Sequence, residues 1–166
     1  TSGTALIEFA FVAPVLMALY LGGFELMDAA SRWRKVTVAT RAIADLTSQY
    51  TSVSNSDLDT VLAASQQIML PYPTTTAGFR VSLVTVDAGG QATVTWSRAR
   101  NATALTPGTP YNIPTNLKQP GISLVVSDVS YLYTPVAMGT LGNIPLGDQI
   151  FMMPRGSATI TLKPDA

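Results

Sequence analysis

Residues 5–24 read ALIEFAFVAPVLMALYLGGF, a run of 20 positions in which Glu8 is the single charged residue. A helix needs about 20 predominantly apolar residues to cross the hydrocarbon core of a bilayer. Cleaved secretory signals have a shorter apolar core of about 7 to 15 residues and end in a small-residue cleavage site. Because this run instead passes directly into a helical pattern, it predicts a membrane-spanning helix.

The helical pattern continues beyond the apolar run, with apolar residues at steps of three and four, which is typical of one face of an amphipathic helix. A helix from Thr4 to about Tyr50 would be roughly 70 Å long, more than twice the thickness of the hydrocarbon core. The half beyond Phe24, which we call the outer half, lies outside the membrane and must therefore pack on something else. Pro14, Gly22 and Gly23 predict local bending or melting. The predicted packing face consists of Trp33, Val36, Ala39, Ile43, Leu46 and Tyr50.

Basic residues gather in this outer half around Trp33. We expect them to face solvent or lipid headgroups, with the tryptophan as an interfacial aromatic residue. They are Arg32, Arg34, Lys35 and Arg41.

Composition excludes several classes of function. The 166 residues suit one small domain plus an extension, and only 12% are charged, against a usual figure of about 25%. Ten basic residues balance ten acidic ones, so nothing recruits nucleic acid. The chain has no Cys and no His, and we find no phosphate loop, metal-spacing motif or nucleophile with its base. We therefore predict no enzyme, no cofactor and no metal site.

The head, residues 51–166, begins with a polar break and a second helix. Ser56 and Asp59 resemble a capping box at the start of a helix over 56–70, which Pro71 and Pro73 end. Asp57 and Asp59 are predicted to serve this cap rather than a cation. The apolar side of the helix carries Leu58, Val61, Leu62, Ile68 and Met69.

Several strands follow this helix. Alternating residues predict a hairpin of strands 79–86 and 91–98 around the turn 87–90. A third strand, 122–133, has an apolar phase that slips near Ser127 and Asp128, which indicates a bulge. Loops are predicted over 101–120 and 135–147, and further strands near 149–153 and 158–162.

These elements together predict an α+β fold. Residues 1–50 form one long helix, half membrane-spanning and half amphipathic. An antiparallel sheet over 79–162 packs on its outer half, beside one short extra helix.

Gly3-Thr4-Ala5-Leu6-Ile7-Glu8-Phe9 resembles the processing motif of type IV pilins and pseudopilins, in which a membrane peptidase cuts after a glycine and leaves glutamate as the fifth mature residue. Residues 3–16, GTALIEFAFVAPVL, followed by Gly22, Gly23 and Glu25, more closely resemble the TadE-like minor pseudopilins of tight-adherence (Flp-type) pili. A looser resemblance extends to residues 79–100, 123–135 and 150–162.

This resemblance implies cleavage between Gly3 and Thr4, and assembly roles for Glu8, Phe9 and Pro14. A cationic amine at Thr4 and a carboxylate one turn away would offset each other's cost in lipid. In a filament, Glu8 could instead meet a neighbouring subunit's amine and select the axial register. The alternative is a carboxylate that only caps free backbone amides.

The resemblance further implies a minor pseudopilin that takes part in assembly or initiation of a tight-adherence pilus, and acts in adhesion through subunit packing. The implied partners are a prepilin peptidase, the inner-membrane assembly platform, and other pilins or a second minor pseudopilin. The head would be periplasmic until the subunit enters the pilus or its tip. Two alternatives remain: a filament-forming subunit in its own right, and a permanently membrane-anchored periplasmic protein whose long loop binds a ligand or adhesion receptor.

Overall fold

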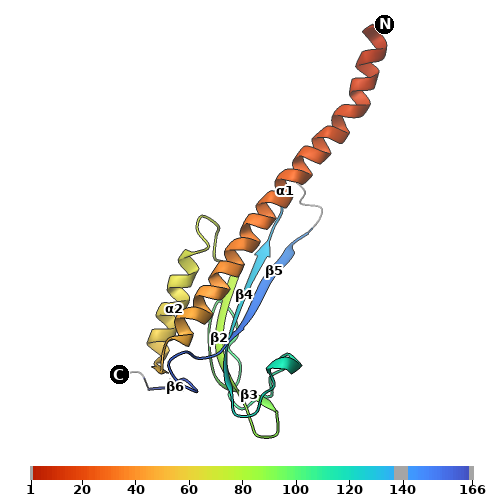
Figure 1. Cartoon of the computed structure of the whole chain (residues 1–166). Coiled ribbons are helices and arrows are strands. Elements are labelled where there is room, and N and C mark those ends of the chain that lie inside the picture. The colour runs from red at the N-terminus through yellow and green to blue at the C-terminus, as the bar shows by residue number, and fades with distance from the viewer. Residues whose placement is uncertain (1, 137–141, 165–166) are drawn as a thin grey trace.

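The computed structural model describes residues 2–136 and 142–164 and has an α+β fold, as the sequence predicts. One long helix projects far beyond a small β-sheet head, and its outer half lies along that head (Figure 1). The elements in chain order are α1 (Ser2–Ser48), β1 (Ser52–Val53), α2 (Asn55–Gln67), β2 (Ala77–Val86), β3 (Ala92–Arg100), the 3-10 helix η1 (Thr115–Leu117), β4 (Ser123–Tyr133), β5 (Ile144–Met152) and β6 (Thr161–Leu162).

The long helix α1 has 47 residues and ends two residues before the predicted limit at Tyr50. It is helical throughout, including Pro14, Gly22 and Gly23, so the predicted melting is not seen. A proline in a helix removes one hydrogen bond, which a long helix with intact turns on both sides can lose without breaking.

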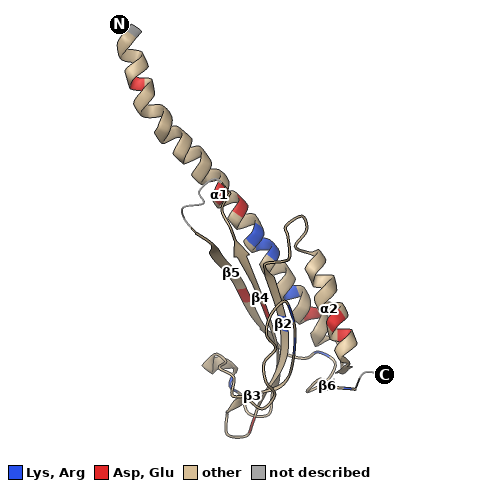
Figure 2. Cartoon of the chain, turned by 180° about the vertical axis from the view of Figure 1, so that it is seen from behind, with Lys and Arg blue, Asp and Glu red and all other residues tan. Residues whose placement is uncertain are grey.

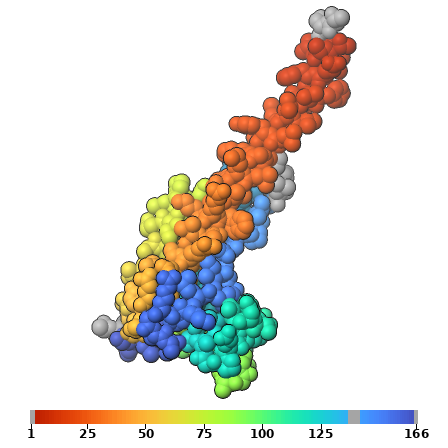
Figure 3. All heavy atoms as spheres, in the orientation of Figure 1, coloured from red at the N-terminus to blue at the C-terminus, as the bar shows by residue number. Residues whose placement is uncertain are grey.

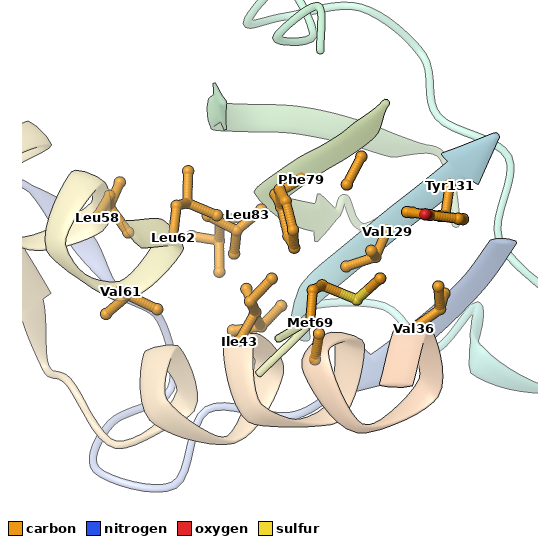
Figure 4. Packing of buried hydrophobic residues seen from close by; sticks show 14 of the residues in the cluster. Val36, Ile43, Leu58, Val61, Leu62, Met69, Phe79, Leu83, Val129 and Tyr131 are labelled. Atoms are coloured by element: carbon orange, nitrogen blue, oxygen red, sulfur yellow. The ribbon is translucent and has the colours of Figure 1, made fainter. Parts of the chain in front are cut away.

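The main sheet has four antiparallel strands in the order β3-β2-β4-β5. Helices α1 and α2 cover one face. Between helices and sheet lies a core cluster in which Val36, Ile43, Leu62, Met69 and Phe79 are fully buried (Figure 4). The sheet therefore packs on the outer half of α1, as the sequence predicts.

The opposite face of the sheet is partly covered by the long loop after β3. There Ile113 packs with Val94, Leu124 and Val126 in a second cluster. The first half of β4 is thus buried on both faces, which explains the slip in its apolar phase. The predicted bulge near Ser127 and Asp128 is wrong, because β4 pairs in continuous register with both neighbours.

The irregularity lies instead between β2 and β3. Leu83 pairs with Trp96 but the next residue, Val84, pairs with Val94, so Thr95 is the extra residue of a bulge. Because the bulge adds one residue to the strand, Val94 and Trp96 point to opposite faces of the sheet although they are two positions apart. Trp96 consequently enters the core beneath the helices, where its indole Nε1 donates a hydrogen bond to the Ile160 carbonyl at 2.9 Å.

The start of α2 differs from the prediction. Ser54 is the N-cap: its Oγ accepts from the Asp57 backbone amide at 3.2 Å, and the Asp57 carboxylate accepts from the Ser54 amide at 2.9 Å. The hydrogen bonds that its carboxylate accepts from the Ser54 amide and hydroxyl lower the pKa of Asp57. The predicted cap of Ser56 and Asp59 is wrong, because Asp59 instead pairs with Arg98 of β3 at 2.5 Å. Ser54 and Ser56 each have an aspartate three residues later, so the sequence fits a cap at either serine. The ion pair of Asp59 with Arg98 leaves Ser54 and Asp57 as the cap.

The C-terminal part of the head also differs. β5 begins at Ile144 rather than near Gln149 and includes Pro145. It is an edge strand, so a residue without an amide hydrogen is tolerated there. The antiparallel sheet ends at Met152, and the predicted strand 158–162 shortens to β6, which pairs in parallel with β1. Of the predicted loop 135–147, residues 137–141 lie outside the described residues.

Candidate functional site: the projecting helix and its junction with the head

The N-terminal half of α1 has no contact that buries its apolar side chains. The large hydrophobic residues from Leu6 to Phe24 are 38% to 77% exposed. Within the described residues, α1 is the helix that is long and apolar enough to cross a membrane. A contiguous apolar surface of this extent requires lipid or other protein to cover it. The helix therefore fits membrane anchoring.

The residues predicted for processing and assembly all lie on this projecting half. Gly3, Thr4, Glu8, Phe9 and Pro14 are all exposed. A Cβ atom added at Gly3 would meet no atom within 4 Å. Nothing in the described chain therefore requires a glycine there.

The predicted packing face is brought only partly to the head. Val36, Ala39 and Ile43 are fully buried, whereas Trp33, Leu46 and Tyr50 are 56%, 40% and 37% exposed. Arg32 lies against the head where Trp33 was expected, and Thr47 where Leu46 was expected. The buried face is therefore displaced by one residue toward the N-terminus at one end and by one residue toward the C-terminus at the other. The residues of α1 that face the head are Glu25, Ala29, Arg32, Val36, Ala39, Thr40, Ile43, Ala44, Thr47 and Ser48.

Polar and aromatic residues meet where α1 first touches the head, and we call them the junction cluster. Glu25 is 6% exposed, and its carboxylate accepts a hydrogen bond from the Tyr133 hydroxyl. The Arg32 guanidinium donates to the Tyr131 hydroxyl at 2.8 Å and pairs with Asp28 at 2.9 Å. It also lies 4.5 Å and 4.8 Å from the ring centres of Tyr72 and Tyr133, within the range of cation–π attraction. The cluster comprises Glu25, Asp28, Arg32, Tyr72, Tyr131 and Tyr133.

The electrostatics of the junction cluster keep Tyr133 protonated and Arg32 cationic. Burial raises the pKa of Tyr133, and its hydrogen bond to Glu25 raises it further. Burial lowers the pKa of Arg32, but its bonds to Asp28 and Tyr131 outweigh this and leave the pKa raised. A protonated tyrosine and a cationic arginine thus fasten the head to α1 directly after the apolar span. The expectation that Arg32 faces solvent or headgroups is wrong.

Sequence reasoning missed this cluster, although two signals were present. Asp28 and Arg32 have the i,i+4 spacing of a helical ion pair. Glu25 and Arg32 continue the three-and-four spacing of Val36 and Ile43 toward the N-terminus. Tyr131 and Tyr133 are both core residues, at most 2% exposed.

Outside this region, the described residues offer little chemistry. No group of three or more acidic residues among them could hold a metal ion. A hollow of about 440 Å³ on the outer face of the sheet is lined by Arg80, Asp128 and Gln149. Arg80 pairs with Asp128 at 3.2 Å, and the Gln149 amide donates to the other oxygen of that carboxylate. These groups satisfy one another and present no nucleophile with a base.

A projecting apolar helix whose outer half is fixed to a small antiparallel sheet is the architecture expected of pilin-like proteins. Residues 3–45 match the TadE-like protein family, which confirms the resemblance carried by Gly3, Glu8 and Pro14. The match covers nearly all of α1, ends before the head, and associates the chain with the tight-adherence pilus. No curated protein and no solved structure matches the chain.

Proposed function

We propose that this chain is a minor pseudopilin that takes part in assembly or initiation of a tight-adherence pilus, and contributes to adhesion by subunit packing rather than catalysis. A prepilin peptidase cuts between Gly3 and Thr4. The mature subunit is anchored in the inner membrane with its head in the periplasm. It then enters the pilus or its tip through contacts with other pilins and the inner-membrane platform.

One observation carries this proposal. The apolar half of α1 is wholly exposed, carries Glu8 near its start, and is joined to a head whose core is complete without it. Such a helix serves equally as a membrane anchor before assembly and as a packing element afterwards. A protein that only needed a permanent anchor would have no use for a carboxylate inside the span, which costs a few kcal/mol to insert without a partner.

The first test is intact mass and N-terminal sequencing of the native protein, produced from its full gene with and without the prepilin peptidase. We expect a peptidase-dependent start at Thr4. An uncut or peptidase-independent terminus would instead support the permanently anchored binding protein. Abundance in sheared filaments separates the remaining alternative, because a filament-forming subunit would be a major component and a minor pseudopilin would not.

A second test concerns Glu8. Glu8→Ala is expected to leave membrane insertion intact or improve it, because a charge is removed from lipid, while impairing incorporation into pili or pairing with partners. Met17→Leu, a change on the same exposed helix that keeps an apolar side chain of similar size, is the matched control and should assemble normally. Normal pilus assembly by the Glu8 variant would exclude a role in register.

A further inference from the structure

The outer half of α1 keeps one side uncovered where it crosses the head. In Figure 3 this side of α1 lies between α2 and β5 and faces the viewer. Trp33 and Val38 are 56% and 52% exposed there. We call this side the basic ridge, formed by Trp33, Arg34, Lys35, Val38 and Arg41.

The basic ridge is flanked by hollows. One of about 650 Å³ separates it from Ile150 and Met152 of β5, and one of about 290 Å³ separates it from Ile68, the residue that follows α2. A third, also about 290 Å³, lies between Trp33 and Val38. Val38 lines all three. A raised row of side chains with a groove on each side is the surface that a second helix packs against.

The basic residues of the ridge form no ion pair within the described residues, and Asp45, which lines the hollow beside Arg41, pairs with Arg155 instead. Four arginines outside the ridge are paired. Figure 2 shows the basic residues of α1 in blue, on the part of the helix that lies beside the strands. Three cations around exposed apolar groups call for an occupant with acidic and apolar groups together.

A second copy of this chain does not supply such a surface. Six carboxylates pair with a side chain or cap a helix within the chain, namely Glu25, Asp28, Asp45, Asp57, Asp59 and Asp128. Of the three other acids in the described residues, Glu8 lies on the projecting helix, while Asp87 at the hairpin turn and Asp148 on β5 accept hydrogen bonds from nearby backbone amides. Three acids on three different elements form no cluster that matches the ridge.

Anionic lipid also fits poorly. If the apolar span ends at Phe24 and α1 stands along the membrane normal, Trp33 lies about 14 Å and Arg41 about 25 Å beyond the hydrocarbon, at 1.5 Å per residue. The headgroup layer of one leaflet is only about 5 to 8 Å thick. Most of the ridge therefore stands clear of the headgroups.

We propose that the basic ridge is the docking surface for an acidic amphipathic helix of a different pilin-like protein. The partner's apolar residues fill the hollows on either side of Val38, and its carboxylates meet Arg34, Lys35 and Arg41. This names the chemistry of a partner in assembly, and so rests on the function proposed above.

The test uses the full-length protein in its own cells, with a photoreactive benzoylphenylalanine at Val38. The same probe at Ala64, an exposed position of α2 away from the ridge, is the matched control. We expect Val38 to give a crosslink to a different protein, within a segment that is helical and rich in Asp and Glu, and Ala64 not to give it. The double variant Arg34→Glu with Arg41→Glu should reduce this crosslink about tenfold or more. Lys118→Glu, a single charge reversal on the long loop, should not.

A compensating change completes the test: replacing the partner's acidic residues by lysine should restore crosslinking to the double variant. Crosslinks to lipid, to a second copy or to a segment without acids would overturn the proposal, as would no crosslink or one insensitive to charge reversal. N-terminal processing is measured in the same cells. If Thr4 is the mature terminus and the crosslink fails, the docking surface is wrong and the pseudopilin assignment stands; without processing, the assignment itself fails.

Discussion

Replacing Tyr133 by phenylalanine removes one oxygen from the junction cluster and nothing else. The hydroxyl is buried, with Tyr133 only 1% exposed, and it donates to the buried carboxylate of Glu25. A hydrogen bond to a charged group contributes about 1.5 to 3 kcal/mol, and the ring that Arg32 contacts is kept. We expect the free energy of unfolding to fall by about 2 to 3 kcal/mol, and Tm by about 5 to 10 °C. The assay is thermal and urea unfolding of the full chain in detergent micelles.

Two comparisons isolate the cause. In a Glu25→Gln background the acceptor is neutral, so Tyr133→Phe should cost only about 1 kcal/mol. Tyr111→Phe, which removes a hydroxyl that accepts from Gln149 near the surface at 2.8 Å, should cost less than Tyr133→Phe. The reasoning is refuted if Tyr133→Phe costs under about 0.5 kcal/mol, or costs the same in both backgrounds.

The pH dependence gives the same prediction a second readout. The folded protein raises the pKa of Tyr133 above the value of about 10 that an unfolded chain has. The folded state therefore holds this proton more tightly, and the resulting stability is complete below pH 10 and is lost as the pH rises above that value. The stability difference between wild type and Tyr133→Phe should shrink above about pH 10. A difference that stays constant through this range would contradict the assigned pKa direction.

Three further substitutions probe the packing of the head, each measured by unfolding of the full chain. Ile43→Ala removes a fully buried side chain and should cost about 2 to 5 kcal/mol; an effect as small as that of Val38→Ala on the exposed side of α1 would show that the helix is not held by this face. Ser54→Ala removes the observed N-cap and should cost about 1 kcal/mol, and an equal loss in Ser56→Ala would restore the cap predicted from sequence. Ser127→Ala removes a buried hydroxyl that has no hydrogen-bond partner in the described residues, so stability should stay level or rise by about 1 kcal/mol, and a clear loss would mean that the hydroxyl has a partner.

The features predictable from sequence are those set by one local property. The length and apolarity of residues 5–24 were sufficient to predict the projecting half of α1, and alternation with a glycine-containing turn predicted the β2–β3 hairpin. Both signals come from neighbouring residues and need no knowledge of what packs where.

The features that were missed depend on contacts between distant residues. Hydropathy selects Trp33 over Arg32 for the buried side of α1, because it cannot anticipate that one tyrosine from the segment after α2 and two from β4 lie around the arginine. Likewise, β4 showed a phase slip because a loop covers its second face, and not because the strand bulges. Burial of a polar group becomes favourable only when its partners are in place.

A carboxylate lies near each end of the apolar span, and the head provides a hydrogen bond to the one nearer to it. Glu8 and Glu25 are 17 residues apart, or about 25 Å along the helix, close to the thickness of a hydrocarbon core. Glu25 has the Tyr133 hydroxyl from its own head, so the single subunit already stabilises it. Glu8 is exposed and beyond the head's reach, so under the proposed function its partner is either the amine that processing creates at Thr4 or that of a neighbouring subunit. An unpaired carboxylate in lipid costs a few kcal/mol. We infer that pairing Glu8 favours the assembled state only by the amount by which a neighbour's amine stabilises it better than the chain's own amine does. The position of Glu8 can therefore select register without adding to the stability of the subunit.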